Sequence, residues 1–344
     1  MKTIKWSFLA MLVLAVIGVG SVILLEASAN EIKSIDKQLE NLNKDALREK
    51  IRDFISIGER NAYTSRNTNI ARAREYICKE ISVLGIEPDL QRFIIRRDET
   101  SGFKLKPYNE NKLHYYSGQR IVIGENITAR ISGNDASKVV VLGAHYDSWR
   151  SLGANDNASG VICLLEALKV LSQFKFENTI EFVFFTAEEQ GYLGSKFYLS
   201  QFLEDERRSI VAAFIVDMIG NNPDKGEGEY EGKEDINLMY DKIKPWISQK
   251  LALDTADAIR KCLPDLPIAV SHSGGRSRGS DNNKFQEKEI ATIFISEDKP
   301  DEYSTRFMHT ENDTIEYIDF DFFAQAVKAV ILSVAAEAGK EWLK

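Results

Sequence analysis

Cysteine is scarce in this sequence and forms no motif. The 344 residues include three cysteines, Cys78, Cys163 and Cys262, which lie far apart and contain no CxxC pair. Their odd number leaves at least one thiol free or in an intermolecular bond. Cys78 and Cys163 lie in apolar helical patterns, which predicts small buried side chains. A disulfide between two of the three stays open as an alternative.

Basic charge is also in short supply. The 52 acidic residues outnumber the 44 lysines and arginines, the formal net charge is −8, and no stripe of basic residues reverses that balance. This excludes a nucleic-acid-binding function, because phosphate contacts need a basic surface. Internal repeats and linker-like segments are missing too, while a hydrophobic content of 44% supports a sizeable core. We therefore expect one α/β domain at 30–344.

The N-terminal 29 residues form a separate segment. A lysine-containing start precedes an uncharged apolar run from Trp6 to Leu25, and small residues follow up to Ala29. This layout predicts a signal peptide at 1–29. The run is also long enough to span a bilayer, so an uncleaved membrane anchor is the alternative. In either case we expect an exported protein that is periplasmic, secreted or held on the outer face of the membrane. No other segment resembles a membrane span.

Apolar strands and helices alternate in the second half of the chain. Near-continuous apolar strands between helices are typical of a sheet that is buried on both faces and has parallel strands at its centre. The sequence therefore predicts an α/β fold of three layers. The predicted elements are a helix at 67–86, two short strands around a turn at Gly124–Glu125, strands at 137–147, 178–189, 209–220 and 290–296, and helices at 158–174, 194–203, 245–262 and 319–342.

Polar residues lie where several of these strands end, or in the loops beside them: His145, Asp147, Asp156, Glu188, Glu189, Asp217 and His309. Ligands of open α/β sheets bind at the carboxyl ends of the strands. Each residue alone has an ordinary explanation; Asp156, for example, could cap the helix that follows it. Together, however, carboxylates at one sheet edge repel one another unless positive charge lies among them. Histidines beside carboxylates suit zinc.

The number of candidate ligands predicts two metal ions. Five ligands exceed the three that one catalytic zinc usually takes from a protein, and they suit two ions that share a bridging carboxylate. Asp156 is the best candidate for the bridge, because it lies in a tight glycine-flanked turn. Asp147 projects to the same face of its strand as His145 and is a candidate to hold the second imidazole nitrogen.

Five motifs occur in order: "GAHYDS", "GANDNASG", "FFTAEEQGYLGS", "VDMIG" and "HTENDT". This series resembles the zinc-dependent aminopeptidase family that includes bacterial leucyl aminopeptidase, a family of co-catalytic dizinc exopeptidases. The similar region runs from about Val139 to Thr314. The resemblance implies a central mixed, mostly parallel twisted sheet of about eight strands with helices on both faces. It also implies an enzyme that removes N-terminal residues from peptides with a free N-terminus.

The resemblance also implies a role for each residue. His145 and Asp217 would hold one zinc ion, Glu189 and His309 the other, and Asp156 would bridge the two. Glu188 would be the general base that takes a proton from the metal-activated water. Neighbouring side chains of an extended strand point to opposite sides, so the two adjacent glutamates need not share one role.

The sequence departs from the family pattern in the loop "GSDNNKF". Asn282 stands where family members often carry histidine, which puts a contact in the substrate pocket in doubt. Arg276 and Arg278 precede this loop, either as solvated residues or as a means of selecting acidic substrates.

Three alternatives share the scaffold. A glutaminyl-peptide cyclase would bind one zinc ion, and a carboxypeptidase relative would need a basic pocket for a C-terminal carboxylate. A binding protein on a degenerate scaffold would have lost ligands or the base. The intact set of positions favours a hydrolase.

Overall fold

The computed structural model describes residues 34–63, 68–98, 102–110, 121–221, 236–241, 244–272, 279–297 and 307–340. The predicted signal peptide or anchor and the two arginines Arg276 and Arg278 lie outside these ranges. None of the described helices combines the length and apolarity that a membrane crossing requires.

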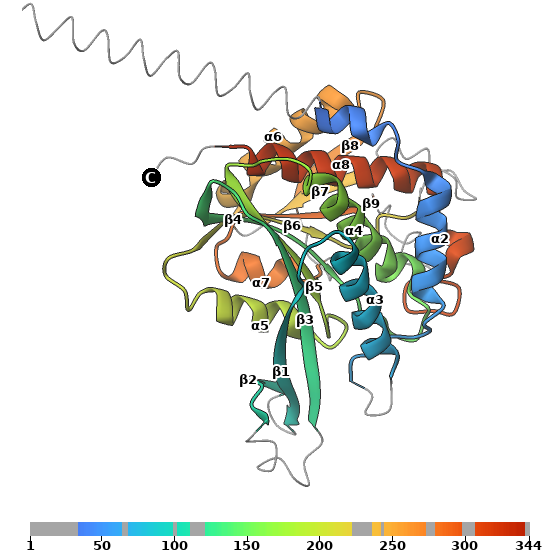
Figure 1. Cartoon of the computed structure of the whole chain (residues 1–344), viewed down its shortest axis with the longest axis vertical. Helices are drawn as coiled ribbons and strands as arrows, with labels where there is room; N and C mark the ends of the chain where they lie inside the picture. Colours follow the sequence, from blue (N-terminus) through green and yellow to red (C-terminus); the bar gives the residue numbers. More distant parts are fainter. Residues whose placement is uncertain are drawn as a thin grey trace, which may run out of the picture.

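The described strands form one mixed sheet of nine strands, one more than the resemblance implied (Figure 1). Its order is β2-β1-β3-β5-β4-β6-β9-β7-β8, and the central pairs β4–β5, β4–β6 and β6–β9 are parallel. The predicted mixed sheet with a mostly parallel core is thereby confirmed. The strands are β1 (Asp89–Asp98), β2 (Gly102–Pro107), β3 (Ile121–Ile131), β4 (Asp135–His145), β5 (Asn178–Phe185), β6 (Ser209–Val216), β7 (Ile236–Tyr240), β8 (Ile268–His272) and β9 (Thr292–Glu297).

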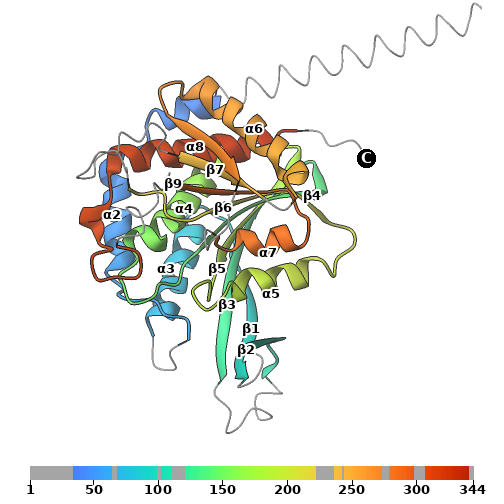
Figure 2. The ribbon, with the colours of Figure 1, turned by 180° about the vertical axis from the view of Figure 1, so that it is seen from behind.

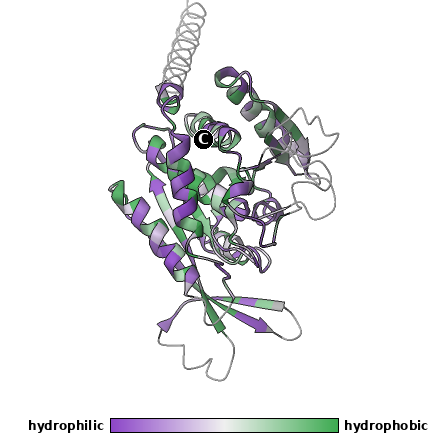
Figure 3. Ribbon diagram, turned by 90° about the vertical axis from the view of Figure 1, so that its right-hand side faces the viewer, coloured by the Kyte–Doolittle hydropathy of each residue, from purple (hydrophilic) through white to green (hydrophobic). Residues whose placement is uncertain are grey.

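Helices cover both faces of the sheet, as predicted (Figures 1 and 2). The first face is covered by α2 (Lys44–Ile55), α3 (Asn69–Val83), α4 (Ser159–Leu171), α6 (Pro245–Cys262) and α8 (Phe320–Ala338). The second face is covered by α5 (Leu193–Phe202) and α7 (Asn282–Glu287). Hydrophilic and hydrophobic residues alternate around these helices, which is the pattern of helices that pack one side against a core (Figure 3).

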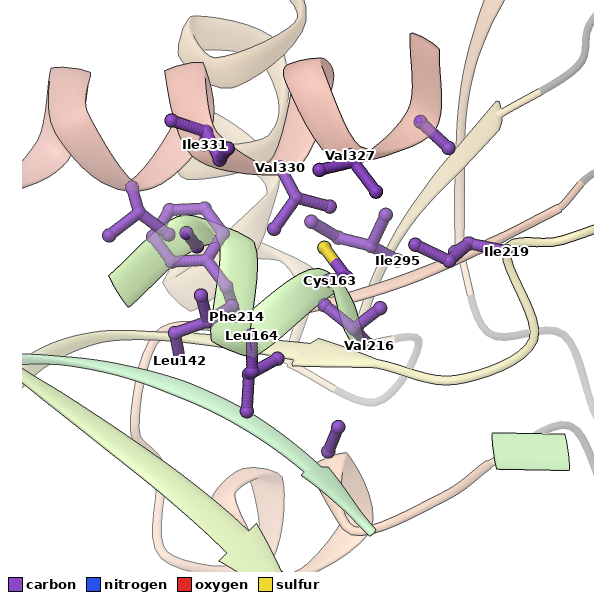
Figure 4. Packing of buried hydrophobic residues seen from close by; sticks show 14 of the residues in the cluster. Leu142, Cys163, Leu164, Phe214, Val216, Ile219, Ile295, Val327, Val330 and Ile331 are labelled. Atoms are coloured by element: carbon purple, nitrogen blue, oxygen red, sulfur yellow. The ribbon is translucent and has the colours of Figure 1, made fainter. Parts of the chain in front are cut away.

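Cys163 lies in the centre of the larger core. Figure 4 shows this residue of α4 among Val216 of β6, Ile295 of β9 and Val330 of α8. Its side chain is fully buried, which confirms the prediction of a small buried side chain. Cys78 is half-buried, and all three cysteines are free thiols, so no disulfide joins them.

Strand β3 corrects the prediction of two short strands around Gly124. The chain runs through this position as one continuous strand, Ile121–Ile131. A Cβ at Gly124 would lie 2.6 Å from Cζ of Phe93 in the paired strand β1. The glycine therefore makes room for an aromatic ring and does not form a turn. Strand β3 pairs with β5 only from Ile127 onward, so its first half, together with β1 and β2, forms an arm that projects from the sheet (Figure 1).

Candidate metal centre

The ends of three parallel strands bring the predicted site residues together. His145 is the last residue of β4, Glu188 and Glu189 follow β5, and Asp217 follows β6. These strands are parallel neighbours, so their carboxyl ends meet at one edge. Asp156 lies in a short irregular π-helical turn, η2 (Ala154–Ala158), that connects β4 to α4.

The side chain of Asp156 lies between the two histidines. Nε2 of His145 is 3.3 Å from Oδ1 of Asp156 and 3.4 Å from Oδ1 of Asp217. Nε2 of His309 is 3.2 Å from Oδ2 of Asp156 and 2.9 Å from Oε2 of Glu189. Each carboxylate oxygen of Asp156 therefore faces a different imidazole, which is the geometry that a bridging ligand requires.

The possible ligand atoms fall into two groups. One group contains His145, Glu188 and Asp217, and within each group the ligand atoms lie within 4.8 Å of one another. The other contains Asp156, Glu189 and His309. Glu188, which sequence reasoning kept apart from the metal ligands, thus lies as close to its group as a ligand would. The two adjacent glutamates belong to different groups.

Several atoms of the centre lack hydrogen bonds. Nε2 of His145, Oε1 of Glu189 and Oδ1 of Asp217 are buried and make none with any residue that the structure describes. Buried polar atoms are nearly always paired in native proteins, so such a cluster needs an explanation. One imidazole nitrogen and two carboxylate oxygens are a donor set that zinc accepts. The residues present therefore fit the metal that the sequence predicts.

Burial and the neighbouring carboxylates shift the pKa values of several groups in the centre. Burial raises the pKa of Glu189 to about 7, and burial together with Asp281 and Asp217 holds the pKa of Glu188 well above its usual range. Hydrogen bonds to Asp156 and Glu189 raise the pKa of His309 to about 10. Burial is thus the main cause for the two glutamates and neighbouring carboxylates add to it, whereas for His309 the carboxylates that it contacts stabilise the charged imidazole.

Asp147 supports the centre in two ways. Its carboxylate accepts hydrogen bonds from the backbone N–H groups of Glu188 and Glu189, at 3.1 and 3.3 Å. Its backbone oxygen lies 3.2 Å from Nδ1 of His145, closer than its carboxylate oxygen at 3.5 Å. The contact with the second imidazole nitrogen that the sequence predicted thus involves mainly the carbonyl, while the carboxylate fixes the turn that carries both glutamates.

Strained backbone accompanies the centre. Ala187, Met218 and His309 all have positive φ angles, between 56° and 59°. The first two are adjacent to Glu188 and Asp217. Non-glycine residues adopt this conformation rarely, and such residues gather at functional sites.

Asp313 is a functional residue that the sequence analysis missed. It lies four positions after His309 in the "HTENDT" motif. Its two carboxylate oxygens accept hydrogen bonds from the backbone N–H groups of Asn155 and Asp156, at 2.7 and 3.1 Å. The loop that carries His309 thereby fixes the backbone of Asp156. A motif shows only that an aspartate is present, and not that it bonds to a backbone about 160 residues away.

Asp281 was also missed, although its loop was noted. It is fully buried, and burial raises the pKa of its carboxyl to about 7. Both its oxygens lack hydrogen bonds to the described residues. The neighbouring Asn282 is buried as well, and its Oδ1 accepts a hydrogen bond of 2.7 Å from the backbone N–H of Ser280. Asn282 therefore stabilises the loop that carries Asp281.

Comparison with known proteins gives consistent matches. Residues 126–334 match peptidase family M28. A leucine aminopeptidase 1 of Paracoccidioides brasiliensis is 32% identical over 222 residues, which cover 60% of this chain and 53% of that relative. The chain thus spans about half the length of this relative.

Solved structures share the fold at lower identity. A zinc aminopeptidase from Bacillus subtilis superposes with a TM-score of 0.67 at 17% identity, covering 88% of this chain and 97% of its own. A glutaminyl cyclase from Bacteroides thetaiotaomicron superposes with a TM-score of 0.64 at 18% identity, covering 85% and 97%. The family match extends over more than half of the sequence and includes every candidate metal ligand. The chain belongs to peptidase family M28.

Proposed function

We propose that this protein is an aminopeptidase that holds two zinc ions and removes N-terminal residues from peptides. The observation that carries the proposal is the position of Asp156, whose two oxygens face two histidines in two separate groups of ligand atoms. The name of the similar Paracoccidioides protein, a leucine aminopeptidase, supports the choice of reaction.

The two groups and the position of Asp156 between the histidines support one assignment of roles. His145 and Asp217 would hold one ion, Glu189 and His309 would hold the other, and Asp156 would be shared by both. Zinc bound there supplies a Lewis acid that makes a coordinated water acidic near neutral pH. A carboxylate oxygen of Glu188 accepts a proton from the attacking water and passes it to the amine that leaves. Burial of Glu188 favours this, because it raises the pKa of the carboxyl and a carboxylate of higher pKa is a stronger base.

The charge of the site favours substrates with a free amino group. Glu188 and Asp281 are not assigned to metal, and their carboxylates leave negative charge beside the ions, so a protonated α-amino group would be attracted there. A blocked N-terminus removes that attraction. Peptides with free N-termini are therefore the proposed substrates.

The discriminating experiment is a panel of three peptides with metal analysis. An aminopeptidase hydrolyses N-terminally free and C-terminally amidated peptides and leaves N-terminally blocked ones intact. About two zinc ions per chain should accompany this activity. Formation of pyroglutamate from N-terminal glutamine, with one ion per chain, would instead identify a cyclase. Cleavage that requires a free C-terminal carboxylate would identify a carboxypeptidase.

We also propose that the protein is exported, on the basis of the apolar run from Trp6 to Leu25 and the small residues before Asn30. N-terminal sequencing of the protein recovered from the cell envelope or medium tests this. A mature chain that begins near Asn30 indicates cleavage, a membrane-bound full-length chain indicates an anchor, and a full-length chain in the cytoplasm contradicts export.

A further inference from the structure

Arg60 is one of the largest fully buried side chains of the described residues, and it lies outside the segment that matches the family. A buried arginine needs partners, because desolvating a guanidinium is costly. Its partners are backbone carbonyls: Nε donates to Tyr146 at 2.9 Å, Nη1 to Leu152 at 2.6 Å and Nη2 to Gly153 at 3.2 Å.

All three carbonyls belong to the loop that joins two candidate metal ligands. Tyr146 directly follows His145, and Gly153 lies three residues before Asp156. The loop therefore contacts the same guanidinium close to both of its ends. Arginine suits this role because its planar fork presents several donors in a fixed geometry.

Further contacts fix Arg60 itself. Its backbone N–H donates to Oγ of Ser148 at 3.1 Å, and its guanidinium lies over the ring of Phe54, 4.7 Å from the centroid. Ser148 in turn donates through its Oγ to the carbonyl of Ser151 at 3.2 Å. The arginine is thus anchored on helix α2 at one side and bonded to the loop at the other.

Gly153 is adapted to the presence of Arg60. Its φ angle is +60°, and a Cβ there would lie 2.7 Å from Nη2 of Arg60 and 2.3 Å from the carbonyl oxygen of Asp156. A side chain at this position would push the guanidinium away from the loop or displace the backbone of Asp156. The close packing of Arg60 against the loop before Asp156 therefore requires glycine at position 153.

The charge of Arg60 also acts on the centre. Burial lowers the pKa of its guanidinium to about 10, so it stays protonated at neutral pH, and Asp313, Asp147 and Asp156 are the carboxylates that interact with it most strongly. It provides a permanent positive charge behind a cluster of acids, whether or not metal is present.

We propose that Arg60 is a positioning residue of the metal centre, which fixes the loop between His145 and Asp156 by hydrogen bonds to three of its carbonyls. The inference rests on the proposed function, because it assigns a role in holding the same two zinc ions. It assigns to the centre a residue from the N-terminal part of the chain, before the family-matching segment begins.

The test uses the full chain with the substitutions Arg60→Lys and Arg60→Met. Lysine keeps the charge but cannot present three donors in a fork, and methionine removes both charge and donors. Zinc affinity is measured on the metal-free protein by competition with a chromophoric chelator. We expect both variants to bind zinc about 10-fold to 100-fold more weakly, the usual loss when the outer contacts of a metal ligand are removed. Excess zinc should restore much of the peptidase activity of Arg60→Lys.

Arg208→Met is the matched control. Arg208 also lies over an aromatic ring, 4.5 Å from the centroid of Phe202, and it donates to Glu181 at 2.6 Å. It directly precedes β6 and therefore lies at the amino end of this strand, whereas the metal centre lies at the carboxyl ends of the strands. This substitution should lower the melting temperature and leave zinc affinity unchanged.

Zinc affinity equal to that of the wild type in either Arg60 variant would overturn the proposal. In the lysine variant, this result would show that a positive charge at this position is enough and that the three hydrogen bonds are not needed. A loss of zinc affinity in Arg208→Met as large as in Arg60→Met would also overturn it, because any destabilisation would then have the same effect. If methionine prevents folding, as judged by circular dichroism, the lysine variant decides. A wild-type chain that binds no zinc would refute the proposed function as well, whereas two ions bound equally by wild-type and variants would refute this inference alone.

Discussion

Glu188 and Glu189 are adjacent in the chain yet face different partners. Glu188 shares a group with His145 and Asp217, and Glu189 shares one with Asp156 and His309. Strand β5 ends at Phe185, so both glutamates lie in the turn that follows it, and the hydrogen bonds from their backbone N–H groups to the carboxylate of Asp147 fix this turn. At this scale the open question is whether Glu188 moves a proton or binds metal.

Substitution of Glu188 by glutamine answers that question. Glutamine keeps the size of the side chain but cannot accept a proton, so kcat should fall about 10²-fold to 10⁴-fold. Zinc content, measured by metal analysis, should stay near that of the wild type. Near-normal activity would refute the role as base, and loss of one ion would assign Glu188 to the ligands.

Residue types at the centre could be predicted from the sequence, because motifs record which side chains follow each strand. The residues that support the candidate ligands could not be predicted in this way. Asp313 and Arg60 bond to backbone atoms of the loop between His145 and Asp156, and such contacts have no counterpart in a pattern of residue types. Asp281 stood in a recognised loop, but only the fold shows that its carboxyl is fully buried.

Secondary structure elements differ in how well they can be predicted from the sequence pattern. The buried central strands β4, β5 and β6 and the long helices α6 and α8 lie where they were predicted, because long apolar patterns are distinctive. Strands β5 and β6 nevertheless end four residues earlier than predicted, at Phe185 and Val216, so the candidate site residues that follow them lie in turns. Strands β1, β2, β7 and β8 were not predicted. All four lie at or next to an edge of the sheet, and β7 and β8 have only five residues each. Strand β3 was wrongly predicted as two strands, because glycine is a common turn residue and the sequence does not show that Gly124 packs against Phe93 of the paired strand.

Substitution of Gly124 by alanine tests the account of strand β3. The added methyl group would collide with the ring of Phe93, which is itself stacked on Phe197 at a centroid distance of 4.5 Å. We expect the free energy of unfolding in urea to fall by about 1–3 kcal/mol, as is usual for overpacking. Ile123→Val, at an exposed position of the same strand, should change it by less than about 1 kcal/mol. Equal effects would contradict the close-packing role of the glycine.

On the scale of the whole molecule, the metal centre joins distant parts of the chain. The candidate ligands come from the ends of β4, β5 and β6, from the turn before α4 and from the loop before α8, so bound ions would hold these elements together. Metal should therefore stabilise the entire domain and relieve the repulsion among its carboxylates.

Removal of zinc with a chelator should lower the melting temperature by several degrees, and added zinc should restore it. A ligand at a thousandfold excess over its Kd contributes about 4 kcal/mol per site to stability. Differential scanning calorimetry with and without zinc measures the effect. The variant Asp156→Asn should lose the response, whereas Asp254→Asn, on the exposed face of α6, should keep it. An unchanged melting temperature of the wild type would count against resident metal.

The loop between His145 and Asp156 is held by Arg60 from one side and by Asp313 from the other. The ribosome makes Arg60 long before the loop and Asp313 long after it. Until Asp313 has been made, the backbone N–H groups of Asn155 and Asp156 lack this side-chain partner. A polypeptide interrupted before Asp313 would therefore leave synthesis with this loop held by Arg60 alone.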